Sequence, residues 1–271
     1  MFVFVLFIIY CVKKIMDKTL IYITENKCPE PLFTAVINHL KVVAEGYPIV
    51  SVSHKPVDLG INICVGEQRR SWACLYRQAL AGCREAKTKH IGIVEHDCFY
   101  TREHVEWEPP TNTKFYYNEN VLLVCWDKKN HPDKMGMYSS FWRHPRLSLS
   151  QLVCNRKLYI DALEKRLDLI DSDRMAKKRI DHLTEPGASK ESKKFKKKLI
   201  ERANSGSSAY LKTLLPDFIE LEKYETFSNR IPNLDVRHGS NFTGPRRGRK
   251  RRYKIKHWGR FEDLINRSIE E

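Results

Sequence analysis

His90-Ile-Gly-Ile-Val-Glu-His-Asp-Cys-Phe-Tyr100 is the stretch on which the fold depends, because a short apolar run ends abruptly in Glu95, His96 and Asp97. In an extended backbone Glu95 and Asp97 project to one face and His96 to the other. Two carboxylates on one face suit a hard divalent cation that holds a diphosphate. The alternative is a buried strand that ends in a solvated turn, with Asp97 capping the turn that begins at Thr101.

Strand-like and helix-like segments alternate around this stretch. The apolar patterns predict strands at 19–24, 47–53, 61–65 and 91–94, and helices at 31–43 and 70–87. This alternation predicts an α/β protein with a mostly parallel, mixed sheet flanked by helices.

The second half of the chain is less regular. It predicts β-rich segments at 115–126 and 135–141, a helix at 150–169 and a terminal amphipathic helix at 260–269. Residues 171–230 are polar and basic, which indicates a partly helical insertion or linker. The predicted organisation is a catalytic-sized domain at 16–170, the insertion at 171–230, and a C-terminal segment at 231–271 that carries a basic loop.

Composition restricts the partners and the compartment. The 271 residues are 42% apolar and 30% charged, as in ordinary globular proteins, and the formal net charge of +15 favours anionic partners such as nucleotide phosphates, nucleic acid or an acidic membrane surface. The eight cysteines include no CxxC pair and no zinc-like spacing. They are therefore predicted to be free core thiols in a reducing cytoplasm, which is the host cytoplasm if the chain is phage-encoded.

The first fifteen residues form an apolar segment that ends in Lys13 and Lys14. Its apolar part is shorter than the about 20 residues that span a bilayer, and it lacks the basic start of a secretory signal. It is either a weak membrane-surface anchor or a translated leader upstream of a start at Met16, and we favour the leader. No stable membrane insertion is expected.

Polar clusters follow three of the predicted strands. They are Thr24-Glu25-Asn26, Ser53-His54-Lys55 and Glu95-His96-Asp97. Open α/β sheets bind ligands beyond the carboxyl ends of their strands, so these clusters predict a shared site. The chain has no Gly-x-Gly-x-x-Gly, Walker loop or nucleophile elbow, which argues against dinucleotide-binding, P-loop and serine-hydrolase enzymes.

Several strings extend this pattern in a consistent order. They are Ile49-Val-Ser-Val-Ser-His-Lys-Pro-Val-Asp-Leu-Gly60, Tyr76-Arg-Gln-Ala-Leu80, Glu95-His-Asp-Cys-Phe-Tyr100, Phe115-Tyr-Tyr-Asn118 and Pro232-Asn-Leu-Asp-Val-Arg-His-Gly239. Together they resemble a family of glycosyltransferases with the GT-A fold, found largely in phages and bacteria. The resemblance covers 19–170 and resumes near 232, and it does not include the basic insertion.

The resemblance implies a hexosyltransferase-like enzyme that takes a sugar from a nucleotide sugar, expected to be UDP-linked, with Mn²⁺ or Mg²⁺ bridging the two phosphates. Glu95 and Asp97 would bind the metal, with Asp97 the stronger candidate because the motif is Glu-His-Asp in place of Asp-x-Asp. His238 would complete the site. His96 is a weaker ligand candidate because it should face away from the carboxylates, and His257 competes with His238.

The resemblance also implies donor-binding residues. Thr24, Glu25 and Asn26 would bind the nucleobase and ribose, Ser53, Lys55 and Asp58 would extend that contact, and Arg70, Ser71 and Arg77 would reach a phosphate. Other roles remain open: Ser71 as a helix N-cap and Arg77 in a helix-surface ion pair.

A catalytic base is required only if the enzyme inverts the anomeric centre. Asp127 follows an apolar strand and Asp235 accompanies His238, so both are candidates for deprotonating an acceptor hydroxyl. The sequence does not separate an inverting from a retaining reaction.

Two basic runs, 190–198 and 246–256, make a polyanionic acceptor plausible. A modified base of phage DNA, flipped into the site, fits this charge, and so do teichoic-type or membrane-linked acceptors. Both runs can also be solvated segments. Two other functions stay open: a non-catalytic nucleic-acid-binding protein on an α/β scaffold, and a nucleotidyltransferase.

Overall fold

The computed structural model describes residues 16–140, 147–172, 197–198, 200–202, 204–205, 223–241 and 255–270. The predicted leader at 1–15, most of the predicted insertion and most of the basic run at 246–256 lie outside these residues.

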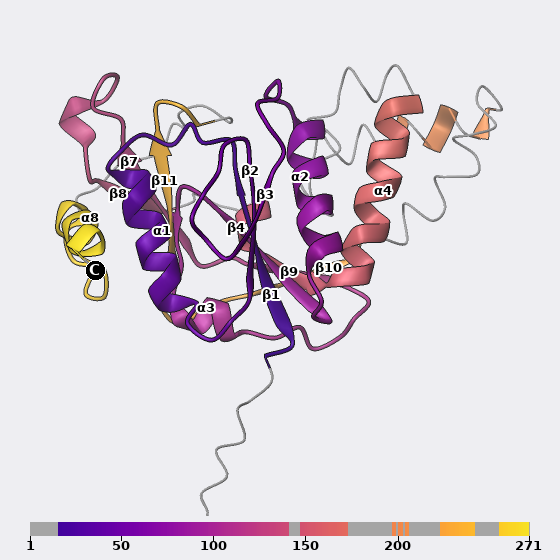
Figure 1. The fold of residues 1–271 in the computed structure, drawn as a ribbon, viewed down its shortest axis with the longest axis horizontal. Helices are drawn as coiled ribbons and strands as arrows, with labels where there is room; N and C mark the ends of the chain where they lie inside the picture. The colour runs from indigo at the N-terminus through magenta and orange to yellow at the C-terminus, as the bar shows by residue number, and fades with distance from the viewer. Residues whose placement is uncertain are drawn as a thin grey trace, which may run out of the picture.

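The main layer is a seven-stranded sheet with the order β10-β6-β9-β4-β1-β2-β3 (Figure 1). Its strands are β1 (Lys18–Thr24), β2 (Ile49–Ser53), β3 (Ile61–Cys64), β4 (His90–Glu95), β6 (Phe115–Asn118), β9 (Leu152–Asn155) and β10 (Tyr224–Phe227). Strand β9 runs antiparallel to β4 and β6, and the other neighbouring pairs of this sheet are parallel. The predicted α/β class with a mostly parallel, mixed sheet is confirmed.

A second sheet of four strands has the order β5-β11-β7-β8. Its strands are β5 (Cys98–Phe99), β7 (Val121–Trp126), β8 (Tyr138–Ser140) and β11 (Asn233–His238). Strand β11 lies between β5, to which it is antiparallel, and β7, to which it is parallel. The C-terminal part of the chain is thereby brought beside the turn that follows β4.

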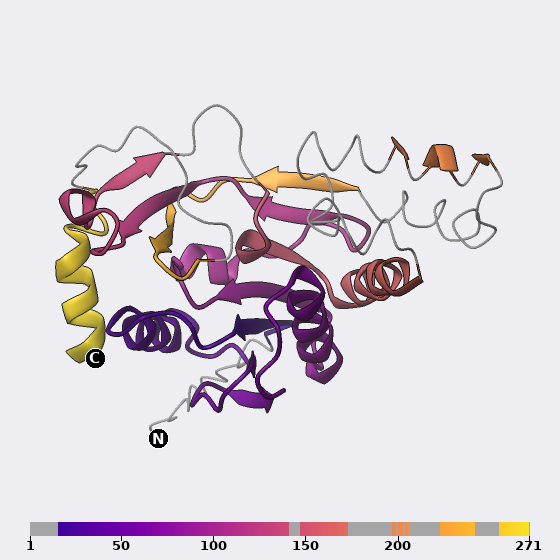
Figure 2. The ribbon, with the colours of Figure 1, turned by 90° about the horizontal axis from the view of Figure 1, so that it is seen from above.

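Helices cover both faces of the main sheet. They are α1 (Leu32–Val43), α2 (Trp72–Glu85), α3 (Arg102–Glu106) and α4 (Arg156–Ser172). A further helix, α8 (Phe261–Glu270), packs against α1 and the second sheet, and η1 (Pro132–Lys134) and η2 (Leu149–Gln151) are short 3-10 turns. Figures 1 and 2 show α2 and α4 together on one side and α1 with α8 on the other.

Side chains of β1 alternate between two cores, as expected for a central strand. Ile21 and Ile23 pack with α2 and α4, whereas Leu20 and Tyr22 pack with the core that contains Leu40 of α1. All four are at most 2% exposed. Burial on both faces explains why the sequence of this strand is apolar without a break from Leu20 to Ile23.

The predicted helix at 150–169 is wrong at its start. Residues 149–151 form η2, residues 152–155 form β9, and α4 begins only at Arg156. Pairing of β9 with both β4 and β6 overrides the local helical pattern, because Leu152, Val153 and Cys154 are buried there. The Asn155 side chain then accepts a hydrogen bond from the Leu158 N–H, 3.1 Å away, at the start of α4.

The predicted insertion at 171–230 is also too long. Strand β10, at its C-terminal end, pairs with β6 and is the edge strand of the main sheet. This strand begins at Tyr224, so the main domain includes residues that the polar composition placed in a linker.

Gly60 lies beside the start of β2, at a position where both the backbone conformation and the available space favour glycine. Its φ is +61°, and an added Cβ would overlap the carbonyl oxygen of Ile49. Gly60→Ala is expected to lower the free energy of unfolding by about 3 kcal/mol, from left-handed strain of about 1–2 kcal/mol together with the cost of displacing backbone. Urea unfolding measures this loss.

Gly46→Ala is the matched control. Gly46 has φ +85° but nothing within 4 Å of an added Cβ, so this variant should show the strain alone. Equal losses in the two variants would contradict the predicted clash at Gly60.

Candidate active site at the carboxyl edge

The segments after β1, β4 and β11 meet at one edge of the molecule. Asp235 of β11 pairs with Cys98 of β5, and the Val236 N–H donates to the Asp97 carbonyl oxygen at 2.7 Å. This pairing places the Asp97 Oδ2 atom 3.8 Å from the His238 Nε2 atom. Two predicted metal ligands, which are far apart in the sequence, therefore lie together.

The predicted shared face of Glu95 and Asp97 is not formed. Strand β4 ends at Glu95, and His96 and Asp97 form a turn before β5. The prediction required an extended backbone through Asp97. Because Asp97 lies in a turn, its side chain does not share the face of the Glu95 side chain as it would in a strand. The Glu95 N–H donates to the Tyr100 hydroxyl at 3.0 Å. Among the described residues, the group of neighbouring metal-ligating side chains consists of Cys28, His96 and His238 and includes neither Glu95 nor Asp97.

The alternative role of Asp97 as a cap for the turn at Thr101 is also wrong. Thr101 itself caps α3, because its hydroxyl accepts from the His104 N–H at 3.2 Å. Asp97 is 6% exposed, and its Oδ2 accepts from the Asn241 side-chain amide at 2.6 Å. The Asn241 Oδ1 in turn accepts from the His238 N–H at 2.5 Å. Asn241 thus connects Asp97 with His238, a role that the sequence pattern did not indicate.

His238 is held as a neutral imidazole. It is 4% exposed, and burial lowers its pKa to about 4 even though Asp97 acts to raise it. Its Nδ1 accepts from the Ser240 N–H at 3.3 Å, whereas its Nε2 is buried with no hydrogen-bond partner among the residues that the structure describes. Neutral imidazole is the form that binds a metal ion.

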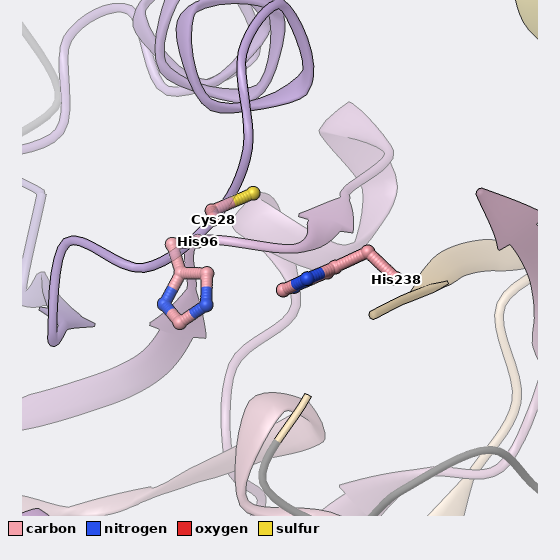
Figure 3. Close-up of side chains that lie close together, drawn as sticks. All are labelled: Cys28, His96 and His238. Atoms are coloured by element: carbon pink, nitrogen blue, oxygen red, sulfur yellow. The ribbon is translucent and has the colours of Figure 1, made fainter. Parts of the chain in front are cut away.

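Cys28 and His96 extend this group. The donor atoms of Cys28, His96 and His238 all lie within 4.8 Å of one another, and Figure 3 shows the three side chains approaching from different segments. Cys28 is buried and its pKa is raised, by burial first and also by Asp97. From the sequence pattern, Cys28 was expected to be a free core thiol and was not expected to be a ligand. The one available signal was its position just past the first strand, at the edge where the other candidate ligands lie.

Glu25 and Arg70 form an ion pair beside His238. Arg70 also donates to the Ser240 carbonyl oxygen at 2.6 Å, so it connects the segment after β1 with the segment after β11. Its positive charge contributes to lowering the pKa of His238. The side chains of Arg70 and Glu25 are 27% and 13% exposed, so this pair is largely removed from water. Both predicted donor-binding residues therefore lie at the site.

The segments after β1 and β2 are joined by hydrogen bonds. The Thr24 hydroxyl accepts from the Asn26 N–H at 2.9 Å, and Asn26, at φ 57°, accepts the Lys55 N–H on its side-chain oxygen at 2.9 Å. Ser53 is fully buried, and its hydroxyl accepts from the Asn62 amide at 2.9 Å. Thr24, Asn26 and Ser53 thus lie together at the carboxyl ends of β1 and β2.

Other predicted donor-binding side chains are engaged elsewhere. Asp58 is fully exposed and pairs at 3.0 Å with Lys41 in the last turn of α1, away from this edge. Ser71 caps α2 by accepting from the Cys74 N–H at 3.1 Å, and Arg77 pairs at 3.1 Å with Asp171 at the surface. The N-cap and surface ion-pair alternatives for Ser71 and Arg77 are confirmed. Lys55 extends its ammonium to Glu67 at 3.2 Å.

The two candidate bases differ in their surroundings. Asp127 follows β7, beside the end of β11; burial acts to raise its pKa, but hydrogen bonds from Asn130 and the nearby His131 and His238 lower it overall. Asp235 is 3% exposed and forms an ion pair with Arg237. An ionised carboxylate without a guanidinium partner is the better proton acceptor, which favours Asp127.

A divalent cation fits Asp97 and His238. Carboxylate oxygen and neutral imidazole are both ligands of Mn²⁺, and two adjacent ligands about 2.1 Å from one ion stand about 3 Å apart. The observed 3.8 Å separation would therefore have to close by about 0.8 Å. His257 is exposed and packs edge-on against Trp258, outside this group.

Helices long and apolar enough to cross a membrane are absent from the described part of the chain.

Comparisons with known proteins give only distant structural likenesses. No family model matches the chain, and no curated protein matches it. A glycosyltransferase involved in glycosylation of the major capsid of PBCV-1 is similar at 9% identity and TM-score 0.40, over 80% of this chain and 91% of that one. A mannosyltransferase from Pyrobaculum calidifontis in complex with GDP-Man and Mn²⁺ is similar at 14% identity and TM-score 0.33, over 57% of this chain and 52% of that one. The bifunctional IspDF from Campylobacter jejuni is similar at 11% identity and TM-score 0.32, over 56% of this chain and 44% of that one. At such scores these likenesses say nothing about the activity, and the fold class rests on the strand order of this chain.

Proposed function

We propose that the protein is a metal-dependent glycosyltransferase that moves a sugar from a nucleotide sugar, expected to be UDP-linked, to an acceptor hydroxyl. The observation that supports this proposal is the approach of Asp97 and His238 to 3.8 Å at the carboxyl edge, beside the Arg70–Glu25 pair. A carboxylate, a neutral imidazole and a guanidinium at one edge suit a cation and a diphosphate.

Asp97 and His238 would hold the cation. A cation bound there supplies neutralisation of the charge that develops on the departing diphosphate. Arg70 would add a second positive charge beside the phosphates, and Glu25 would accept hydrogen bonds from ribose hydroxyls. Asn241, which bonds both to Asp97 and to the backbone of His238, would keep the two ligands in position.

Asp127 would act as the base if transfer inverts the anomeric centre. The lowered pKa of Asp127 keeps its carboxylate ionised. This carboxylate lies close to Gly239, the residue after β11, since a Cβ added to Gly239 would be 3.4 Å from the Asp127 Oδ1. A carboxylate so placed next to His238 can accept the proton of an acceptor hydroxyl.

A polyanion is the acceptor class that the net charge of +15 favours, and DNA that carries a hydroxylated base is our proposed example. The basic runs at 190–198 and 246–256 on which this choice rests lie almost wholly outside the described residues.

Thermal unfolding with UDP, GDP and the corresponding nucleotide sugars, each with and without Mn²⁺, tests the donor site. A ligand at 100 times its dissociation constant adds about 2.7 kcal/mol of stability. We expect stabilisation that requires nucleotide and metal together. A chain that responds to no nucleotide but binds DNA in a salt-sensitive way would instead be a non-catalytic nucleic-acid-binding protein. Release of pyrophosphate from a nucleoside triphosphate would indicate a nucleotidyltransferase.

A further inference from the structure

Two side chains beside the proposed donor site have no role in the proposed reaction. The Cys28 thiol and the His96 imidazole lie with His238 in a group whose donor atoms are within 4.8 Å of one another. Cys28 lies shortly after β1, His96 is in the turn after β4, and His238 ends β11 (Figure 3). Three separate segments thus deliver one thiol and two imidazoles to one point.

The surroundings of these donors leave them poorly satisfied by protein groups. The Cys28 Sγ makes a long contact of 4.0 Å with the Pro29 carbonyl oxygen. The buried His238 Nε2 has no hydrogen-bond partner within the described ranges. A buried polar atom that lacks a partner costs about 1–3 kcal/mol, so native proteins leave few of them. A bound ion would remove this cost.

We propose that Cys28, His96 and His238 form a binding site for a borderline-soft divalent transition-metal ion, best represented by Zn²⁺. Thiolate and imidazole are zinc ligands, whereas a thiolate disfavours Mg²⁺. Three protein ligands with one open position are a common zinc arrangement, and Asp97, whose Oδ2 lies 3.8 Å from the His238 Nε2, is close enough to take the fourth position.

The geometry requires only a small closure. Zinc at about 2.05 Å from nitrogen and about 2.3 Å from sulfur holds its ligand atoms about 3.3–3.6 Å apart. The donor atoms would move together by up to about 1.5 Å from their 4.8 Å limit. If Nε2 of His238 is the ligand, its proton would shift to Nδ1, and Nδ1 would give up the hydrogen bond that it accepts from the Ser240 N–H. The Cys28 proton leaves to solvent as the Zn–S bond forms.

This zinc site shares His238 with the proposed donor cation, so the two ions exclude one another. Zinc binding itself needs no nucleotide and stands apart from the proposed function. The competition between the ions rests on that function.

Titration of the metal-free protein with Co²⁺ tests the site directly, because cobalt replaces zinc and reports its ligands by absorption. We expect tetrahedral visible bands and a thiolate-to-cobalt charge-transfer band, both lost when one equivalent of Zn²⁺ is added. Cys28→Ser should remove the charge-transfer band and weaken Zn²⁺ binding, measured against a chromophoric chelator, by at least about 100-fold, more than loss of an outer hydrogen-bond partner costs.

Cys74→Ser is the matched control. Cys74 is also buried and also lies beside an imidazole, with its Sγ 3.4 Å from the His54 Nε2. It should keep both the band and the affinity. His96→Asn, at a partly exposed position, is a second variant that should weaken zinc binding if Cys28→Ser does not fold, as judged by circular dichroism.

Three results would overturn the zinc site: folded wild-type protein without a charge-transfer band, a band that persists in Cys28→Ser, or a band lost only in Cys74→Ser. Failure of the proposed function can be distinguished from failure of the zinc site. In that case UDP with Mn²⁺ would not stabilise the protein, while the cobalt spectrum would still show the bands expected for the zinc site. If both proposals hold, Zn²⁺ should suppress the stabilisation by UDP with Mn²⁺.

Discussion

Asp97→Asn is expected to lower sugar transfer by about 1,000-fold and to leave the protein folded. The substitution removes the negative charge that would hold the cation, and metal assistance to a leaving diphosphate is worth several kcal/mol, with each 1.36 kcal/mol equal to a tenfold change in rate. The fold should survive because the new side chain keeps the shape of Asp97 and an oxygen that can accept from the Asn241 amide. Transfer from a labelled nucleotide sugar measures the effect.

Asp58→Asn is the matched control for this variant. It removes one carboxylate at a fully exposed site whose ion pair with Lys41 is weakened by solvent and lies away from the carboxyl edge, so turnover should stay within about twofold of wild type. Turnover by Asp97→Asn equal to that of Asp58→Asn would remove Asp97 from the mechanism. Loss of the nucleotide-dependent rise in unfolding temperature in Asp97→Asn alone would support it.

Local patterns were sufficient for the strands that end at Thr24 and Glu95, but they did not predict β11, the strand that carries His238. The strand before Glu95 was predicted because its apolar run is continuous, and the structure buries that strand in the sheet between β1 and β9. The same kind of local pattern failed at 150–155, where Leu152 and its neighbours fit a helix equally well. Only pairing with β4 and β6, which are far away in the sequence, makes this segment a strand.

The composition of the site depends on non-local pairing. The resemblance pointed to His238, but its contact with Asp97 arises from the antiparallel pairing of β5 and β11. Cys28 could not be recognised as a possible ligand, because zinc patterns in a sequence need closely spaced cysteines and histidines. Here the third side chain of the proposed site, His238, comes from a strand more than a hundred residues away. Asn241 lies in a turn where many polar residues would fit, so nothing marked it as the residue that connects Asp97 with His238.

Arg70→Ala is expected to affect stability and activity together. Glu25 would be left as a largely buried carboxylate without its guanidinium, and the Ser240 carbonyl oxygen would lose its donor. Breaking a fully buried pair costs about 3–5 kcal/mol, and the partial exposure of Arg70 reduces our expectation to about 2 kcal/mol. Urea unfolding measures this loss, and transfer should fall by about 100-fold because the charge beside the phosphates is gone.

The double variant Arg70→Ala/Glu25→Gln separates the two effects. Removing the Glu25 charge eliminates the unpaired carboxylate, so we expect the double variant to regain about half of the lost stability. Transfer should not recover, because a neutral glutamine cannot replace the positive charge of Arg70 beside a diphosphate. Recovery of activity in parallel with stability would mean that Arg70 only supports the loops after β1 and β11. Recovery of stability alone, with transfer preserved in the single variant Glu25→Gln, would mean that the Arg70 guanidinium acts on the donor.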